Sequence, residues 1–119
     1  MSIDERIRNL FMAVDAQDTA DFVSYLTDDC QFIFGNAPAV NGKEAIYDAV
    51  EGFYSSIGSL SHSVENIIVS DDKVVSYGNV VYIRLDGNPV PANFCNVFKL
   101  EGNLIKKYQI YVDISQLYA

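Results

Sequence analysis

Two titratable side chains stand out in this sequence, and proton transfer is the chemistry that suits them. His62 is the only histidine and lies in the alternating stretch 60–69, whereas Asp113 directly follows the apolar stretch 104–112. A carboxylate in an apolar wall has a raised pKa and can abstract a proton next to a carbonyl group, with a histidine as its partner or as a second base. Two plainer roles are also open. Asp113 can cap a short helix that begins at Ile114, and His62 can be a hydrogen-bonded residue at the rim of a sheet.

A metal or nucleotide cofactor is not expected. The two cysteines, Cys30 and Cys95, are far apart in the sequence, and one histidine cannot complete a cluster of zinc ligands. A glycine-rich phosphate-binding loop is also missing from the sequence. Both cysteines lie in apolar, strand-like stretches, which predicts buried free thiols.

The composition is typical of one soluble domain over residues 1–119. Half of the residues are hydrophobic and a fifth are charged, an ordinary globular balance. The net charge of −8 argues against nucleic acid and anionic membrane surfaces as partners, because binding to either depends on basic residues. The chain has no apolar stretch of the roughly 20 residues that span a membrane, and its charged N-terminus is unlike a signal peptide. We therefore expect a cytoplasmic protein.

Three amphipathic helices are predicted in the first half of the chain. Apolar residues recur at helical spacing over 3–14, and Ser2 with Glu5 forms a capping-box pattern at the start of this stretch. A second helix is expected to begin after Asp18, a good N-cap, and to end before a short strand at 30–34. A third helix is expected to begin after Asn41 and to end at Gly58.

The second half of the chain is predicted to form strands, because the hydrophobic period changes from about 3.6 to 2 residues after Gly58. Short turns separate four stretches, at 60–69, 73–85, 92–100 and 104–112, which predicts an antiparallel meander. Long strands in a small sheet must twist and coil. The expected fold class is α+β: three N-terminal helices packed on a strongly curved, mostly antiparallel sheet that forms a cone with one internal pocket.

In the order of these elements the sequence resembles the nuclear-transport-factor-2-like superfamily, and within it the SnoaL-like, polyketide-cyclase-like branch. The stretches that carry the resemblance span nearly the whole chain: FMAVDAQD at 11–18, LTDDCQF at 26–32, VNGKEAI at 40–46 and YQIYVD at 108–113. The resemblance implies a fold but no single activity, because this superfamily includes isomerases, epoxide hydrolases, dehydratases, cyclases and non-catalytic binding modules.

Three activities of the superfamily lack their residues in this chain. Ketosteroid isomerases use a tyrosine and two acids at positions that match Leu10, Phe34 and Asn96, so the base and the oxyanion donors are missing. Limonene-epoxide-hydrolase members use an Arg-x-Asp pair that is absent from 80–82, and the similar spacing at 84–86 lies too near a turn unless the loop is shortened. Scytalone-dehydratase members need two histidines, and this chain has one.

The SnoaL-like cyclases use an aspartate of the terminal strand as acid/base, and Asp113 matches it. Strand alternation puts Gln109, Tyr111 and Asp113 on one face of the sheet, which the resemblance implies is the concave face. The predicted catalytic residues are therefore Asp113 and His62. The predicted ligand pocket, for a small apolar molecule, is lined by Phe34, Phe53, Tyr77, Asn79, Phe94, Asn96, Phe98 and Tyr111.

Two functions of different classes are open. One is an acid/base enzyme, of isomerase, cyclase or hydrolase type, that acts on an apolar cyclic or polyketide-like compound. The other is a non-catalytic ligand-binding or dimerisation module of the same fold.

The outer sheet face is predicted to carry Cys95, Val97, Tyr108, Ile110 and Val112, which is too apolar for a solvated surface. Because sheet-to-sheet dimers are common in this superfamily, a homodimer through this face is expected.

Overall fold

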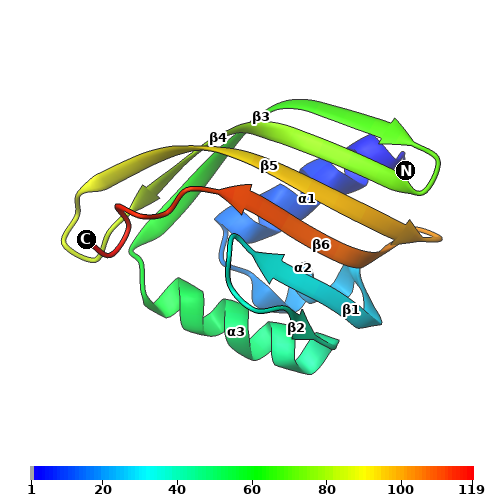
Figure 1. The fold of residues 1–119 in the computed structure, drawn as a ribbon, viewed down its shortest axis with the longest axis horizontal. Helices are drawn as coiled ribbons and strands as arrows, with labels where there is room; N and C mark the ends of the chain where they lie inside the picture. Colours follow the sequence, from blue (N-terminus) through cyan, green and yellow to red (C-terminus); the bar gives the residue numbers. More distant parts are fainter. Residues whose placement is uncertain (1) are drawn as a thin grey trace.

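The computed structural model describes residues 2–119, in which three helices pack on one six-stranded sheet (Figure 1). The helices are α1 (Ile3–Asp15), α2 (Thr19–Ser24) and α3 (Lys43–Ser55). The strands are β1 (Leu26–Phe34), β2 (Val40–Asn41), β3 (Ser59–Ser70), β4 (Lys73–Ile83), β5 (Pro89–Glu101) and β6 (Leu104–Val112). This arrangement confirms the predicted α+β fold class.

The first two helices begin where their capping residues predict. Ser2 Oγ accepts a hydrogen bond from the backbone N–H of Glu5 at 3.1 Å, and the Asp18 carboxylate accepts one from the N–H of Asp21 at 3.1 Å. Only Tyr25 separates α2 from β1, and Leu26, the first residue of β1, pairs with Ile105 of β6.

The third helix begins differently from the prediction. Its N-cap is Gly42, with φ of 91° and no side-chain cap, and not Asn41. Asn41 instead pairs with Gln31 in the short strand β2, which the sequence did not predict. Only a glycine adopts this backbone conformation easily, so Gly42 makes the sharp change from strand to helix.

The sheet has the strand order β2-β1-β6-β5-β4-β3. Strands β3 to β6 form the predicted antiparallel meander, whereas β1 lies parallel to β6. The helices lie on one side of this curved sheet, with α1 behind the meander and α3 beside β1 and β2 (Figure 1). The core therefore sits between the concave face of the sheet and the helices.

A β-bulge in β3 bends the sheet next to Gly78. The register shifts between Val64 and Asn66, opposite Gly78 of β4. A Cβ atom on Gly78 would overlap the carbonyl oxygen of Ser63 and lie 2.8 Å from the backbone nitrogen of Glu65. Glycine at this position therefore allows the close approach of the two strands, and the bulge increases the local twist.

The register between β5 and β6 corrects the predicted outer face. Tyr108 pairs with Phe98 and Ile110 pairs with Asn96, and paired side chains lie on the same face. Phe98 and Asn96 are buried on the concave face, so Tyr108, Ile110 and Val112 lie on that face as well and not on the outer one. Cys95 and Val97 lie on the outer face as predicted.

No helix in the described residues is long and apolar enough to cross a membrane.

Candidate functional site

A cavity of about 310 Å³ lies between the helices and the concave face of the sheet. All three helices and all six strands contribute to its wall, which is mostly aromatic and aliphatic. Its buried end is formed by Phe22, Phe32 and Tyr108, whose rings pack against one another. An apolar cavity with few polar groups is the usual form of a small-molecule site.

The mouth of the cavity is marked by those wall residues that are exposed to solvent. These are Ala37, Pro38, Ala49 and Tyr118. Tyr118 belongs to the C-terminal segment, and its hydroxyl lies 2.7 Å from Ser56 Oγ at the end of α3. The segment is also held by Arg84, whose Nη1 donates to the carbonyl of Gln116 at 2.9 Å. The C-terminal residues thus form one side of the mouth.

His62 lies in the cavity wall and is held there by Asp15 of α1. Its ring Nδ1 lies 2.6 Å from Asp15 Oδ1, and its backbone N–H donates to Asp15 Oδ2 at 2.9 Å. A carboxylate accepts hydrogen bonds, so this contact places the ring proton on Nδ1 and leaves Nε2 as an acceptor when the ring is neutral. The His62 side chain is only 9% exposed and Asp15 27%.

Two aromatic rings fix the plane of the imidazole. The ring centroids of Phe11 and Phe94 lie 5.0 and 5.1 Å from that of His62. Packing from both neighbours and the hydrogen bond from Nδ1 to Asp15 leave the ring little freedom to rotate. A histidine held in this way is pre-organised for proton transfer at Nε2.

Three tyrosine hydroxyls are the other main polar groups of the cavity wall. Tyr54, Tyr82 and Tyr108 come from α3, β4 and β6, and all three side chains are buried. Burial raises the pKa of Tyr82 to about 12 and also raises the pKa of Tyr54 and of Tyr108 well above the ordinary tyrosine value. The three phenols therefore stay neutral and can donate hydrogen bonds.

None of these three hydroxyls has a hydrogen-bond partner among the described residues, although buried tyrosine hydroxyls usually have one. The same is true of the buried Asn96 Oδ1 on β5 and of Ser76 Oγ beside it on β4. Asn96 lines the cavity and is 2% exposed. The tyrosine hydroxyls thus offer hydrogen-bonding groups to whatever fills the cavity.

The structure brings five of the ten predicted site residues together. The cavity wall contains His62, Phe34, Phe53, Phe94 and Asn96. Phe98 is fully buried in the core behind this wall, where its ring centroid lies 4.6 Å from that of Tyr108.

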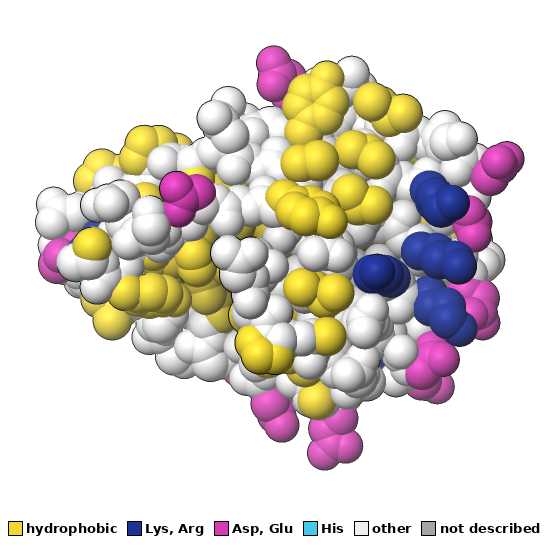
Figure 2. Space-filling model, in the orientation of Figure 1, with side chains coloured by type: hydrophobic (Ala, Val, Ile, Leu, Met, Phe, Trp, Pro, Cys, Tyr) yellow, Lys and Arg dark blue, Asp and Glu magenta, His cyan; other side chains and the backbone are white. Residues whose placement is uncertain are grey.

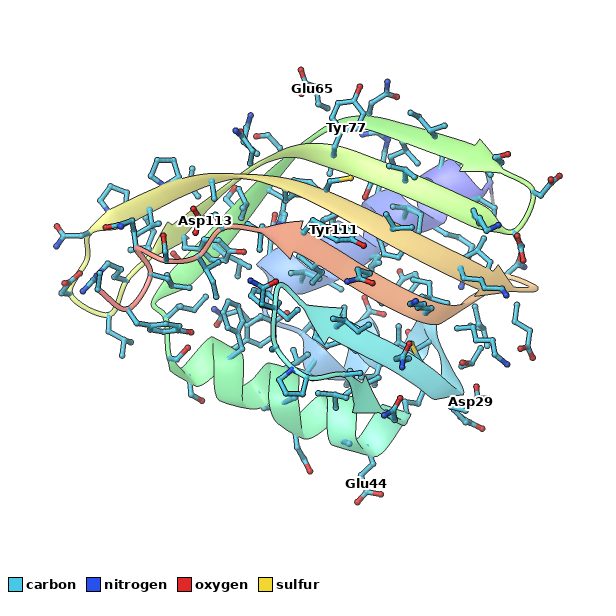
Figure 3. All side chains as sticks on the ribbon, viewed as in Figure 1. Asp29, Glu44, Glu65, Tyr77, Tyr111 and Asp113 are labelled. Atoms are coloured by element: carbon cyan, nitrogen blue, oxygen red, sulfur yellow. The ribbon has the colours of Figure 1, made fainter. Side chains whose placement is uncertain are left out.

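The predicted pocket positions of Tyr77, Asn79 and Tyr111 are wrong. Tyr77 pairs with Cys95, and Cys95 pairs with Tyr111, so these three side chains share the outer face of the sheet (Figure 3). Asn79 is in phase with Tyr77 and is exposed. The sequence shows that alternate residues share a face, but the pairing between strands decides which set faces inward.

Asp113 does not lie in the cavity wall, so its predicted position is also wrong. It follows the end of β6, is exposed, and accepts a hydrogen bond from the backbone N–H of Ser115 at 2.9 Å (Figure 3). This hydrogen bond lowers the pKa of the Asp113 carboxyl. A base in an apolar wall would have the opposite shift. Asp113 caps a turn in the C-terminal segment. The short helix beginning at Ile114, which the sequence offered as its alternative role, is not formed.

Asp15 and the three tyrosines were missed in the sequence. Asp15 ends α1, where an acidic side chain is unfavourable with the helix dipole, and α1 has no basic residue in its last turn. That unfavourable position was a signal in the sequence that the Asp15 carboxylate has a partner elsewhere in the fold, which is His62. The tyrosines gave no such signal, because an aromatic residue in a strand or helix is usually part of the core.

The cysteines and other possible metal ligands show no site. Cys30 is buried, as predicted, and burial raises its thiol pKa to about 12, whereas Cys95 is only half-buried. Across residues 2–119, no group of three or more His, Cys, Asp or Glu side chains is placed to hold a metal ion.

Several solved structures have this fold. An NTF2-like protein of unknown function from Burkholderia pseudomallei superimposes with a TM-score of 0.90 at 15% identity, covering 100% of both chains. A proposed SnoaL-like polyketide cyclase from Jannaschia sp. CCS1 gives 0.85 at 20% identity over 98% of this chain and 88% of that one. TerC, co-crystallised with polyporic acid, gives 0.86 at 15% identity over 98% and 95%. At these identities the likeness shows the fold alone.

No curated protein sequence matches the chain. The SnoaL-like domain family, in contrast, matches residues 7–108, which include all of α2, α3 and β1 to β5. The match therefore covers most of the fold and the greater part of the cavity wall. Together with the helical layer, the strand order and the cavity, it shows that the chain belongs to the SnoaL-like domain family of the NTF2-like fold.

Proposed function

We propose that this protein is an acid/base enzyme, of isomerase, cyclase or hydrolase type, that acts on an apolar cyclic or polyketide-like compound bound in the cavity. The observation that carries the proposal is the pair formed by His62 and Asp15 at the cavity wall. His62 is the catalytic residue, and Asp15 is a positioning residue that fixes its tautomer and orientation.

The proposed step is the transfer of a proton from a carbon next to a carbonyl group. Nε2 of His62 takes the proton, and the electron pair of the broken C–H bond moves into the carbonyl to form an enolate. The Asp15 carboxylate stabilises the resulting imidazolium, and a neutral tyrosine hydroxyl donates to the enolate oxygen. His62 then returns a proton to the substrate. General base catalysis of this kind contributes about 10²–10⁴-fold to a rate.

Asp113 has no part in this step, because it is exposed and its carboxylate is engaged by Ser115. TerC, which has the same fold, was co-crystallised with polyporic acid, and this supports a cyclic compound as the ligand. The free thiols of Cys30 and Cys95 fit the expected cytoplasmic location, where the glutathione pool keeps thiols reduced.

The experiment is deuterium exchange into a small ketone such as 1-indanone, followed by proton NMR in D₂O. The wild-type protein should accelerate the loss of the signal of the protons next to the carbonyl. His62→Gln should abolish the acceleration, and Asp113→Asn should keep it. An acceleration that persists in His62→Gln would show that this residue is not the base.

A second candidate is a non-catalytic ligand-binding module. The low number of titratable side chains in the wall favours it, because His62 is the sole histidine and carboxylates are absent from the wall. In this case 1-indanone would bind without exchange, and His62→Gln would bind it equally well. The same set of samples therefore separates the two candidates.

We also propose that the protein forms a homodimer through the outer face of the sheet. A row of side chains, Tyr77, Cys95 and Tyr111, crosses three strands in register, and Val75 and Val97 form the next row. Figure 2 shows hydrophobic side chains in rows across this face, next to a group of basic side chains. Tyr111 is 53% exposed. An apolar centre with a charged rim is typical of protein interfaces.

A further inference from the structure

We infer that the cavity selects an uncharged compound of one or two rings that carries a hydroxyl or carbonyl group, and that it rejects the carboxylate analogue of the same size. This inference rests on the proposed function in taking the cavity as the ligand site, and adds the charge, size and polar groups of the ligand.

The charge follows from the composition of the wall. None of the wall residues is a Lys, Arg, Asp or Glu. With the His62 ring neutral, a charged ligand group would be buried without a counter-ion. That is far more costly than burying a neutral polar group that has a hydrogen-bond partner. Arg84 is the basic residue that holds the C-terminal segment at the mouth, and its guanidinium is engaged by Asp86 and by the carbonyl of Gln116.

The surroundings of the cavity make an anion the least favoured charge. Asp15 lies directly behind His62, and its charge raises the pKa of Tyr54, Tyr82 and Tyr108 in addition to the effect of burial. Asp18 and Glu51 act on Tyr54 in the same direction. A ligand carboxylate in the cavity would meet the same unfavourable potential that opposes ionisation of the tyrosines.

The size follows from the volume. A cavity of about 310 Å³ lies at the lower end of the roughly 300–1,000 Å³ that small-molecule pockets occupy. Rings dominate its wall, with Phe22, Phe32, Phe34, Phe53 and Phe94 from four different elements. A flat compound of one or two rings fits within this volume and can contact these rings face to edge.

The polar groups of the ligand follow from the unpaired groups of the wall. The hydroxyls of Tyr54, Tyr82 and Tyr108 can donate to an oxygen atom of the ligand. Each of these hydroxyls can also accept a hydrogen bond from the ligand, since a phenol oxygen is both donor and acceptor. A ligand hydroxyl can accept from one tyrosine and donate to another, so a phenol or a hydroxyketone pairs with these groups, whereas a simple hydrocarbon leaves them unpaired.

Isothermal titration calorimetry with three compounds of equal ring size tests the inference: 2-naphthol, 2-naphthoate and the protonated 2-naphthylmethylamine. We expect 2-naphthol to bind at least about tenfold more tightly than either charged compound. Tyr108→Phe should weaken its binding several-fold, and the control Tyr111→Phe, on the outer face, should not. Equal or tighter binding of naphthoate or of the amine would overturn the inference, as would the failure of all three to bind.

The variant Ala49→Trp separates this inference from the proposed function. Ala49 is an exposed residue of α3 at the mouth, so a larger side chain there obstructs the cavity without disturbing the core. If a charged compound binds best and Ala49→Trp blocks it, the charge inference is wrong but the cavity is still the ligand site. If Ala49→Trp leaves the binding of every compound unchanged, the cavity is not the site and both proposals fail.

Discussion

Asp15 and His62 are 47 positions apart in the sequence and are joined by two hydrogen bonds that the Asp15 carboxylate accepts, one from the imidazole Nδ1 at 2.6 Å and one from the backbone N–H at 2.9 Å. One carboxylate thus fixes both the ring and the strand that carries it. Helix α1 and strand β3 meet at this contact, so the same interaction stabilises the packing of the helical layer and orients the candidate base.

The first prediction concerns the tautomer of His62. Asp15→Asn replaces the acceptor carboxylate with a neutral amide, so the preference for the proton on Nδ1 should be lost. Long-range proton–nitrogen NMR spectra report the tautomer, and the chain has a single histidine, which makes the signal unambiguous. We expect the exchange activity towards 1-indanone to fall by roughly 10²-fold in the same variant. Asp113→Asn is the matched control, and an identical loss in that variant would contradict the proposed roles.

The second prediction separates binding from stability at Tyr108. Its hydroxyl lines the cavity and forms no hydrogen bond with the other described residues, so Tyr108→Phe removes no hydrogen bond from the folded protein. The free energy of unfolding should stay the same or rise by up to about 1 kcal/mol. Ligand affinity should nevertheless fall. Urea unfolding and calorimetry on the same samples check this, and a strongly destabilised variant would mean that the hydroxyl has a partner within the protein.

The third prediction is a loss of stability in alkali. Below pH about 10, Tyr82 is neutral in both the folded and the unfolded chain. Between that value and its folded pKa of about 12, the unfolded chain loses the proton and the folded chain keeps it, so the free energy of unfolding falls as the pH rises. The shift of about two units corresponds to roughly 3 kcal/mol.

Urea unfolding at about pH 9 and about pH 11 measures this effect. Tyr82→Phe should reduce the loss of stability between the two values, because its side chain cannot ionise. Burial also raises the pKa of Tyr54 and Tyr108, so part of the loss should persist in the variant. A variant with the full loss of the wild type would show that Tyr82 is not desolvated in the folded protein.

The fourth prediction concerns the bulge in β3. Gly78→Ala should lower the free energy of unfolding by roughly 1–3 kcal/mol, because its Cβ would overlap the backbone of Ser63. Gly52→Ala is a matched control within α3, where a Cβ meets no atom within 4 Å. That change should raise stability by about 0.5–1 kcal/mol through the better helix propensity of alanine. Equal effects at the two glycines would mean that the strands do not approach as closely as described.

The fifth prediction tests the dimer. Tyr111→Lys places a charge in the centre of the apolar outer face, and the dimer should dissociate at least about tenfold more readily. Light scattering over a range of concentrations gives the mass. The wild type should have the mass of two chains, and the variant should approach that of one. A wild-type protein with the mass of one chain at all concentrations would contradict the proposed interface.

Local patterns in the sequence were sufficient for the types and the order of most elements. Ser2 and Asp18 directly precede the helices that they cap, and the change of hydrophobic period after Gly58 is also a local property. The short strand β2 was missed because two residues are too few for a period, and it forms only where Gln31 and Phe32 offer their backbone groups.

The faces of the strands and the pair at the cavity wall were decided by the tertiary structure. Side chains alternate along a strand, so a shift of one residue in the pairing moves every one of them to the other face. For this reason Tyr111 was predicted on the concave face and Tyr108 on the outer face, and the structure has the reverse. The sequence does not show which residue of β5 lies opposite each of them. His62 was recognisable as the only histidine, but its partner Asp15 became visible only when α1 packed against β3 and brought together groups that no sequence spacing connects.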